Sequence, residues 1–354
     1  MSPEKLTEAD ILDREEANIP TTSSSILPTP ISYPATVSYR IANTWLRLIA
    51  SGIIAILFIH ILHIKLRPID VVEPARPTPP PVAEAYVTFL AHSDDPRPWY
   101  FNAVRRLMFQ LKYDPLTLDP HPKDFVVITT PGVPEWQLEQ LREEGAIIAP
   151  RPLIDHLPLP ENGISRYAEV YTKLFIFNLT DYERVLFVDA DQLMVKPLTR
   201  IWDDPNAWPE SGMAACGESK SAWDHPTPIE DQNYFNSGFM LARPDEKTFN
   251  ELLQEKDFDP WLPEQNLLNH YFRRDGPRPW RPLNHMKGFR FVTTFPRKVD
   301  LEAGIHVLHD KMWLAHLDRE VKEVWRQKLG RMEGYWLAMD RGPEAWNSTS
   351  LTYM

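Results

Sequence analysis

The feature that most limits the possible folds is an alternation of short apolar runs with helical patterns between residues 85 and 188. Such an alternation is typical of a parallel sheet covered by helices on both faces. The sequence therefore predicts an α/β fold with a mixed, mainly parallel, Rossmann-like sheet. In chain order, the predicted elements are a strand over 85–90, a helix over 99–111, a strand over 125–130, a helix over 135–144, a strand over 146–149, a helix over about 166–177 and a strand over 185–188.

Three segments precede this pattern. Residues 1–44 are rich in acidic residues, Ser, Thr and Pro, and are predicted to be a disordered tail. The run Leu48–Ile64 contains no Asp, Glu, Lys or Arg, which makes 45–66 a predicted transmembrane anchor. A signal peptide or a buried helix is the alternative, but the run begins late and no small-residue cleavage pattern follows it. Residues 67–82 are Pro-rich and are predicted to form an extended stem, and 83–354 a single folded domain.

Composition excludes one class of function. The net charge of -11 opposes nucleic-acid binding, because a phosphate backbone requires an excess of Lys and Arg. The single cysteine, Cys216, rules out an intramolecular disulfide. It lies in the apolar stretch 213–216, so we expect an inert core residue.

Two carboxylates follow the most apolar predicted strand. The strand over 185–188 runs directly into Asp189, and Asp191 comes two residues later. An Asp-x-Asp sequence alone is a weak signal, since acidic pairs are common in solvated turns. This pair, however, lies at the carboxyl end of a strand, where open α/β sheets bind ligands. Two carboxylates supply oxygen ligands to Mn²⁺ or Mg²⁺ and leave positions free for a diphosphate, so the pair predicts a divalent metal site.

Further segments occur with this pair in a characteristic order. In combination they resemble the glycogenin-like, metal-dependent, retaining glycosyltransferases (glycosyltransferase family 8), in particular the fungal N-acetylglucosaminyltransferase-like members. The resemblance extends over roughly residues 85–313. The segments that carry it are 85–90 (AYVTFL), 171–174 with 182–191 (YTKL and YERVLFVDAD), 234–240 (YFNSGFM), 264–269 (EQNLLN) and 307–313 (VLHDKMW).

The resemblance implies a function and a location. The implied fold is a nucleotide-sugar-binding GT-A domain, and the implied enzyme uses Mn²⁺ or Mg²⁺ to move a sugar from UDP-N-acetylglucosamine or UDP-glucose to a glycan or glycoprotein acceptor. The implied location is the Golgi membrane, with one N-terminal helix in the membrane and the catalytic domain in the lumen. The positive charges on the two sides of the run do not decide this orientation. The glycosylation sequons at Asn178 and Asn347 are compatible with it.

The resemblance also implies a third metal ligand, for which two histidines compete. The spacing from His to Lys is compressed here, and Met312 replaces the family's proline, so His306 and His309 are both candidates. His309 is preferred because it ends the apolar run 305–308, as the family's ligand ends its strand.

The remaining site residues are taken from the matching positions. Gln265 would steady positive charge at the anomeric carbon, and Glu264 replaces the family's shorter aspartate on the acceptor side. The expected catalytic residues are Gln265, Glu264, Lys311 and Asn236, and the expected metal ligands Asp189, Asp191 and His309. The expected donor-binding residues are Thr88, Phe89, Leu90, Tyr100, Lys173, Asp189, Ala190, Asp191, Asn236, Ser237 and Lys311. Trp280 and Trp313 are candidates for an acceptor-sugar platform or, as is commoner for tryptophan, for the edge of the core.

Two other functions compete with this interpretation. The first is a membrane-tethered protein that binds a sugar nucleotide or glycan without turnover, which loss of a metal carboxylate would favour. The second is a nucleotidyltransferase, which carries a Gly-rich phosphate loop after its first strand. Residues 91–96 (AHSDDP) contain no glycine, so the sequence disfavours the second alternative.

Overall fold

The structure is a computed structural model that describes residues 83–341 except 94, 96, 162–168, 204–206, 208–209, 219–232, 284–290, 293–295 and 315. The predicted tail, anchor and stem (1–44, 45–66 and 67–82) lie outside the described residues. Within the described part of the chain, no helix has both the length and the apolar character needed to cross a membrane.

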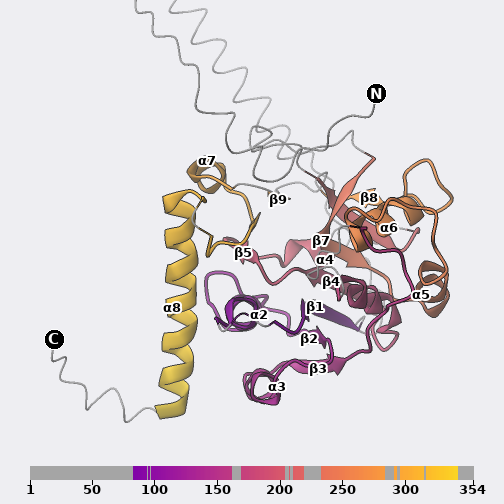
Figure 1. The fold of residues 1–354 in the computed structure, drawn as a ribbon. Helices are drawn as coiled ribbons and strands as arrows, with labels where there is room; N and C mark the ends of the chain where they lie inside the picture. Colours follow the sequence, from indigo (N-terminus) through magenta and orange to yellow (C-terminus); the bar gives the residue numbers. More distant parts are fainter. Residues whose placement is uncertain are drawn as a thin grey trace, which may run out of the picture. The chain divides into compact units, whose positions relative to one another are not determined.

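A seven-stranded mixed sheet forms the centre of the domain (Figure 1). Its strand order is β3-β2-β1-β4-β7-β6-β8, and only β7 runs antiparallel to its neighbours. The predicted α/β class with a mainly parallel sheet is therefore confirmed. The strands are β1 Glu84–Leu90, β2 Asp124–Thr129, β3 Ile147–Pro150, β4 Arg184–Val188, β6 Met213–Gly217, β7 Phe235–Ala242 and β8 Arg281–Pro282.

A second sheet has three strands, of which the first, β5, directly follows β4 in the sequence. It consists of β5 Gln192–Met194, β10 Val307–His309 and β9 Phe291–Val292, in the order β5-β10-β9. β10 pairs antiparallel with β5 and parallel with β9. Only the turn 189–191 separates β4 from β5, so the chain passes from one sheet to the other at the predicted metal site.

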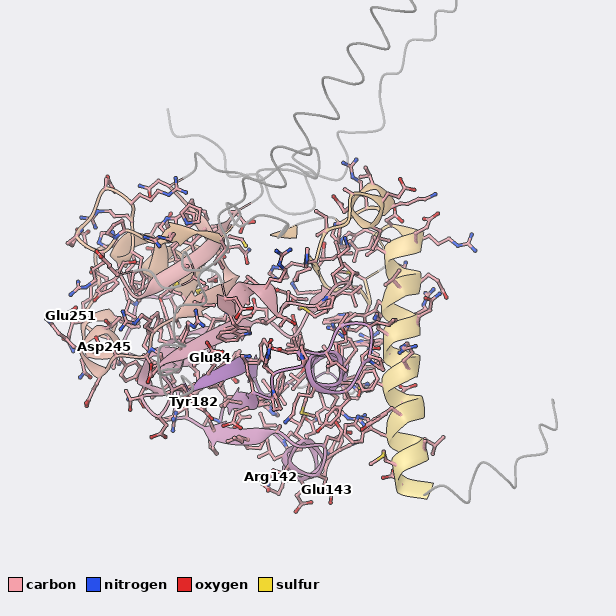
Figure 2. The ribbon with its side chains drawn as sticks, turned by 180° about the vertical axis from the view of Figure 1, so that it is seen from behind. Glu84, Arg142, Glu143, Tyr182, Asp245 and Glu251 are labelled. Atoms are coloured by element: carbon pink, nitrogen blue, oxygen red, sulfur yellow. The ribbon has the colours of Figure 1, made fainter. Side chains whose placement is uncertain are left out.

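Helices cover both faces of the large sheet and enclose two hydrophobic cores. Side chains of α2 Trp99–Lys112, α3 Glu135–Glu143 and α8 Arg319–Arg341 belong to the first core. Side chains of α5 Glu246–Leu252 and α6 Pro263–Tyr271 belong to the second core. Figure 2 shows from behind that α5, with the labelled Glu251, lies on the other side of the domain from α8. The short helices are α4 Arg200–Asp203 and α7 Lys298–Glu302.

One predicted helix has a different form. The segment expected as an α-helix over about 166–177 is a 3-10 helix, η2 Val170–Asn178, and residues 166–168 lie outside the described part. With three residues per turn, Tyr171, Leu174 and Phe177 form one row, and all three are fully buried in the second core. The segment is apolar on nearly every side. Its sequence therefore lacks an apolar stripe whose period would distinguish a 3-10 helix from an α-helix.

Candidate active site

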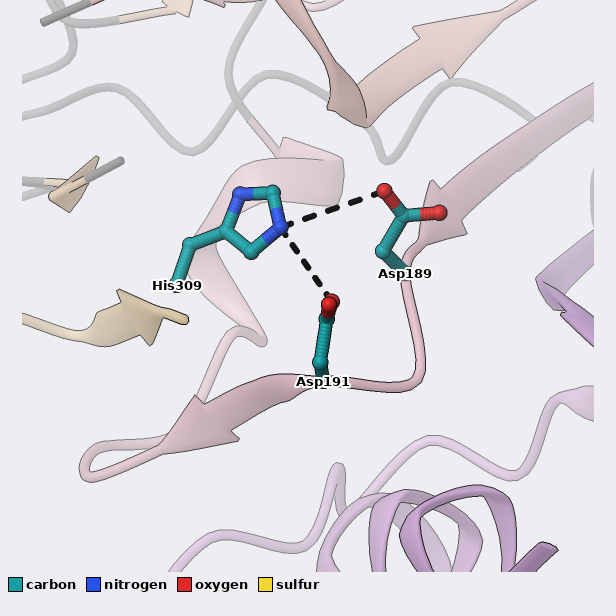
Figure 3. A group of neighbouring side chains, drawn as sticks. All are labelled: Asp189, Asp191 and His309. Carbon is teal, nitrogen blue, oxygen red and sulfur yellow. Dashed lines mark ion pairs between the residues drawn. The ribbon is translucent and has the colours of Figure 1, made fainter. Parts of the chain in front are cut away.

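Three side chains suited to metal binding lie together where the two sheets meet. Asp189 and Asp191 occupy the turn between β4 and β5, and His309 ends β10. One ligand atom from each residue lies within 4.8 Å of the others. Nε2 of His309 is 3.2 Å from Oδ1 of Asp191 and 3.9 Å from Oδ2 of Asp189 (Figure 3). The structure thus brings together the three residues expected as metal ligands.

Strand pairing places the two candidate histidines at different distances from the carboxylates. In the antiparallel pair of β5 and β10, His309 lies opposite Gln192, the residue that follows Asp191. The carbonyl of His306 instead accepts the N–H of Val195, at the far end of β5. Only His309 is therefore placed beside the two carboxylates, in agreement with the preference drawn from the sequence.

The three groups strongly perturb one another. Burial would raise the pKa of Asp191, but the neighbouring His309 and lysines outweigh it and hold that pKa well below its ordinary value. Burial raises the pKa of Asp189 against the opposing charge of Lys173. Burial would lower the pKa of His309, yet the two aspartates raise it. Binding of a divalent cation requires a neutral imidazole, so the cation would compete with protonation of His309.

Gly238 of β7 keeps the space between these ligands open. A Cβ atom there would lie 2.6 Å from Cε1 of His309 and 2.7 Å from Oδ2 of Asp189, closer than real Cβ atoms approach their neighbours. Two carboxylates and one imidazole form a donor set compatible with Mn²⁺, with coordination positions left for a substrate. The residues present therefore fit a divalent metal ion.

Lys173 is buried next to the metal-binding turn. Its Nζ lies 2.8 Å from Oε1 of Glu264 and 3.2 Å from Oδ1 of Asp189. Burial would lower the pKa of Lys173, but these two carboxylates raise it well above its usual value. Ser237 donates its hydroxyl to the same Glu264 oxygen at 2.8 Å. Glu264 is thus directed toward Lys173, a contact that the sequence did not predict.

A second polar network surrounds Gln265. Its Nε2 donates to Glu218 at 3.2 Å and to the hydroxyl of Tyr234 at 3.1 Å. Nδ2 of Asn236 donates to the same Glu218 oxygen at 2.7 Å. Gln265 and Asn236, both expected as catalytic residues, therefore share one carboxylate.

Sequence reasoning missed Glu218. It immediately follows β6, which runs parallel to β4, so Glu218 and Asp189 lie at the same edge of the sheet. The available signal was an acidic residue directly after the apolar run 213–217, the same pattern that identified Asp189.

The expected donor-binding residues of β1 differ in exposure. The side chains of Thr88 and Leu90 are buried in the domain, at 0% and 2% exposure, whereas that of Phe89 is partly exposed. Tyr100 is exposed at the start of α2, and the side chain of Ala190 is buried in the first core. Contacts of Thr88, Leu90 and Ala190 with a donor would therefore have to come from their backbone. These assignments remain predictions.

The two candidate platform tryptophans have different surroundings. Trp280 is buried at 2% exposure and packs against Phe235 with ring centroids 5.2 Å apart. It belongs to the second core, which agrees with the commoner of the two alternatives expected for it and not with a sugar platform. Trp313 is partly exposed, stacks on Trp99 at 6.1 Å and meets Tyr100 edge to face at 5.1 Å.

Lys311 lies two residues after His309 and is partly buried. After His309, the charge of Lys311 also helps to hold the pKa of Asp191 below its ordinary value. Cys216 is fully buried in the first core, as expected.

Comparison with known proteins identifies similar sequences. Residues 132–284 match the model of glycosyl transferase family 8. An uncharacterized protein of Schizosaccharomyces pombe is 27% identical over 277 residues, covering 64% of this chain and 73% of the relative. Galactinol synthase 4 of Arabidopsis thaliana is 28% identical over 293 residues, covering 73% of this chain and 83% of the relative.

Similar solved structures include the galactosyltransferase LgtC in complex with donor and acceptor sugar analogs. It has 16% identity and a TM-score of 0.45, and the match covers 70% of this chain and 95% of that chain. The glycosyltransferase GlyE of Streptococcus pneumoniae TIGR4 has 15% identity and a TM-score of 0.46, with 73% and 64% coverage.

Proposed function

We propose that this chain, whose residues 132–284 match the model of glycosyl transferase family 8, transfers a sugar from a UDP-sugar to a glycan or glycoprotein acceptor with a divalent metal. The observation that carries the metal-dependent part is the convergence of Asp189, Asp191 and His309 around the space left by Gly238. Mn²⁺ is the proposed metal, with Mg²⁺ as the alternative.

Asp189, Asp191 and His309 would hold the metal ion in this proposal. A bound divalent cation offsets the negative charge that grows on the departing diphosphate. Lys311 adds a second positive charge on the same side. The positive charge of Lys173 contacts both the partly exposed Asp189 and the buried Glu264, so it offsets the repulsion between these two carboxylates.

Gln265 is the proposed contact to the face of the sugar away from the diphosphate. Its carbonyl oxygen accepts the N–H of Ser237 at 3.0 Å and its amide nitrogen bonds to Glu218, so the side chain is fixed from both ends. We propose a front-face path that retains configuration, in which the departing phosphate oxygen accepts the proton of the acceptor hydroxyl. No separate general base is then required.

The donor is proposed to be UDP-N-acetylglucosamine or UDP-glucose. Because relatives at 28% identity are galactinol synthases, UDP-galactose belongs in the same test. The experiment is to measure hydrolysis of each UDP-sugar by the full-length chain in detergent, with Mn²⁺, with Mg²⁺ and with a chelator. One UDP-sugar is expected to be hydrolysed only when metal is present, and Asp191→Ala is expected to remove this activity. Full turnover in the presence of chelator would contradict the metal mechanism.

We also propose that residues 45–66 anchor the chain in the Golgi membrane with the catalytic domain in the lumen. The support is the uncharged run 48–64 in the sequence. Asn178, a sequon residue at the end of η2, is partly exposed and offers a test. After the microsomes are solubilised in detergent, an endoglycosidase is expected to lower the apparent mass of the wild-type protein, and Asn178→Gln is expected to reduce that change. A chain without glycans that protease digests from outside the microsomes would contradict this topology.

A further inference from the structure

The turn that carries Asp191 rests on a fully buried arginine from a distant helix. Arg106 of α2 has 0% exposure. Its Nη2 donates to the carbonyl of Ala190 at 2.8 Å, and its Nη1 donates to the carbonyl of Gln192 at 2.6 Å. These two carbonyls lie on either side of Asp191, so one planar guanidinium fixes the backbone both before and after this residue.

Two further side chains complete this arrangement. Nη1 of Arg106 also donates to Oε1 of Gln110 at 2.6 Å, and Nε2 of Gln110 donates to the carbonyl of Met194 at 2.5 Å. Trp325 of α8 covers the guanidinium, with 4.3 Å between Cζ of Arg106 and the ring centroid. We call Arg106, Gln110 and Trp325 the brace.

The chemistry of the brace indicates more than a packing role. Arg106 donates hydrogen bonds to a side-chain amide oxygen and to two backbone carbonyls, none of which is a carboxylate. Burial lowers the pKa of Arg106 and outweighs the nearby charge of Asp191, which raises that pKa. Burying a cation whose hydrogen-bond partners are neutral costs free energy, and an apolar side chain of similar size would usually stabilise a core at least as well. What the buried guanidinium provides is a fixed turn, because its donors lie in one rigid plane and hold two carbonyls in defined positions at once.

We propose that Arg106 is a positioning residue that holds Asp191 in the geometry required for metal binding, and that Trp325 of the C-terminal helix holds Arg106. The proposal rests on the metal-dependent function proposed for this site. Both α2 and α8 lie outside residues 132–284, the part of the chain that matches the family model. The metal site of this chain would therefore depend on elements on both sides of that region.

The sharpest variant is Arg106→Lys, which keeps the positive charge but replaces a planar fork by a single ammonium. Arg105→Lys is its matched control. The adjacent Arg105 donates from Nε to Glu144 at 2.7 Å, and Glu144 is not part of the turn. For α8, Trp325→Leu is compared with Arg331→Ala, since Arg331 is on the same helix and bonds Asp114. Gln110→Met serves as a second variant if Arg106→Lys fails to fold.

Two measurements on the full-length chain in detergent separate positioning from general stability. The first is the Kd for Mn²⁺ without donor, from the electron paramagnetic resonance signal of free Mn²⁺. Loss of a group that orients a metal ligand typically weakens binding by about 10- to 100-fold, and we expect this for Arg106→Lys, a smaller effect for Trp325→Leu and no change in either control. The second is amide hydrogen exchange in the metal-free protein. Exchange is expected to rise at 189–194 and to stay at the wild-type rate in β1 and β2.

The outcomes are distinguishable. Wild-type Mn²⁺ affinity together with wild-type exchange at 189–194 in folded Arg106→Lys would overturn the proposal. An equal rise of exchange across α2, β1 and β2 would also overturn it, because the loss would then be global. If the wild-type chain itself binds no Mn²⁺, the proposed metal-dependent function fails, and the exchange result alone then decides whether Arg106 fixes the turn.

Discussion

The backbone N–H of Asp189 donates to the carbonyl of Gly238 at 2.8 Å, while a Cβ atom on Gly238 would lie 2.7 Å from Oδ2 of the same aspartate. The neighbouring strand β7 therefore fixes the backbone of one proposed metal ligand and leaves room for its carboxylate.

Gly238→Ala is expected to weaken Mn²⁺ binding and to lower stability. The added methyl group would meet Asp189, His309 and Asn236, and overpacking of this kind costs about 1–3 kcal/mol. Urea unfolding and Mn²⁺ titration measure the two effects. Gly330→Ala on α8 is the control, because nothing lies within 4 Å of its Cβ position, and it should stabilise the helix by about 0.5–1 kcal/mol. Wild-type Mn²⁺ affinity in Gly238→Ala would show that the metal does not occupy this space.

His309→Ala is expected to raise the Mn²⁺ concentration for half-maximal activity by at least about 100-fold, the upper end of what loss of an outer-shell partner costs. The two aspartates stay in place, so the protein should remain folded. His306→Ala is the matched control, since His306 lies at the far end of β5. The assignment of His309 is wrong if the His306 variant, and not the His309 variant, needs more metal.

Glu264→Gln is expected to destabilise the protein by about 3 kcal/mol, because it leaves the buried Lys173 with one fewer counter-charge. Lys173 should then pair more fully with Asp189, which would weaken Mn²⁺ binding. Urea unfolding and Mn²⁺ titration test both effects. Glu264→Asp keeps the charge and should retain more of each property than Glu264→Gln. Equal losses in the two variants would argue against a role for this charge.

Asp114→Asn is expected to cost about 3 kcal/mol at pH 7, because Asp114 is fully buried and bonds Lys328 and Arg331 of α8. Burial would raise the pKa of Asp114, but these two cations outweigh it and lower that pKa. A lowered pKa in the folded state gives stability that is present above the unfolded value of about 4 and is lost as the pH falls below it.

The measurement for Asp114 is urea unfolding of wild type and variant between pH 7 and pH 3. The difference between them should be constant above about pH 5 and shrink below about pH 4. Asp155→Asn, at an exposed position, should show little difference at any pH. A difference that persists unchanged to pH 3 would contradict the ion-pair explanation.

Much of the sheet was predictable because its strands are short apolar runs bounded by turn residues. The predicted strand over 185–188 and the observed β4 Arg184–Val188 differ by one residue. The type of helix at η2 was not predictable, because Tyr171, Leu174 and Phe177 belong to a segment that is buried on almost every side.

Within the site, too, residues that are close in the sequence were predictable, whereas most contacts made through tertiary packing were not. Asp189 and Asp191 share one turn, so their proximity follows from the sequence alone. The choice of His309 over His306 agreed with the structure because the end of an apolar run marks the end of a strand. Glu218 and Arg106 reach the site through tertiary packing of separate elements. The apolar run before Glu218 is a local signal for its place at the sheet edge, but the sequence around Arg106 contains no comparable signal.

The pairing of β10 with β5 has a consequence for the order of events during protein synthesis. His309 is made 118 residues after Asp191. At a translation rate of about 5–20 residues per second, the ribosome needs roughly 6 to 24 s to cover that interval. During this time the nascent chain already holds the aspartates and β4 but lacks the strand that pairs with β5. The growing polypeptide therefore passes through a stage in which the large sheet is nearly fully synthesised while the metal-binding group is still incomplete.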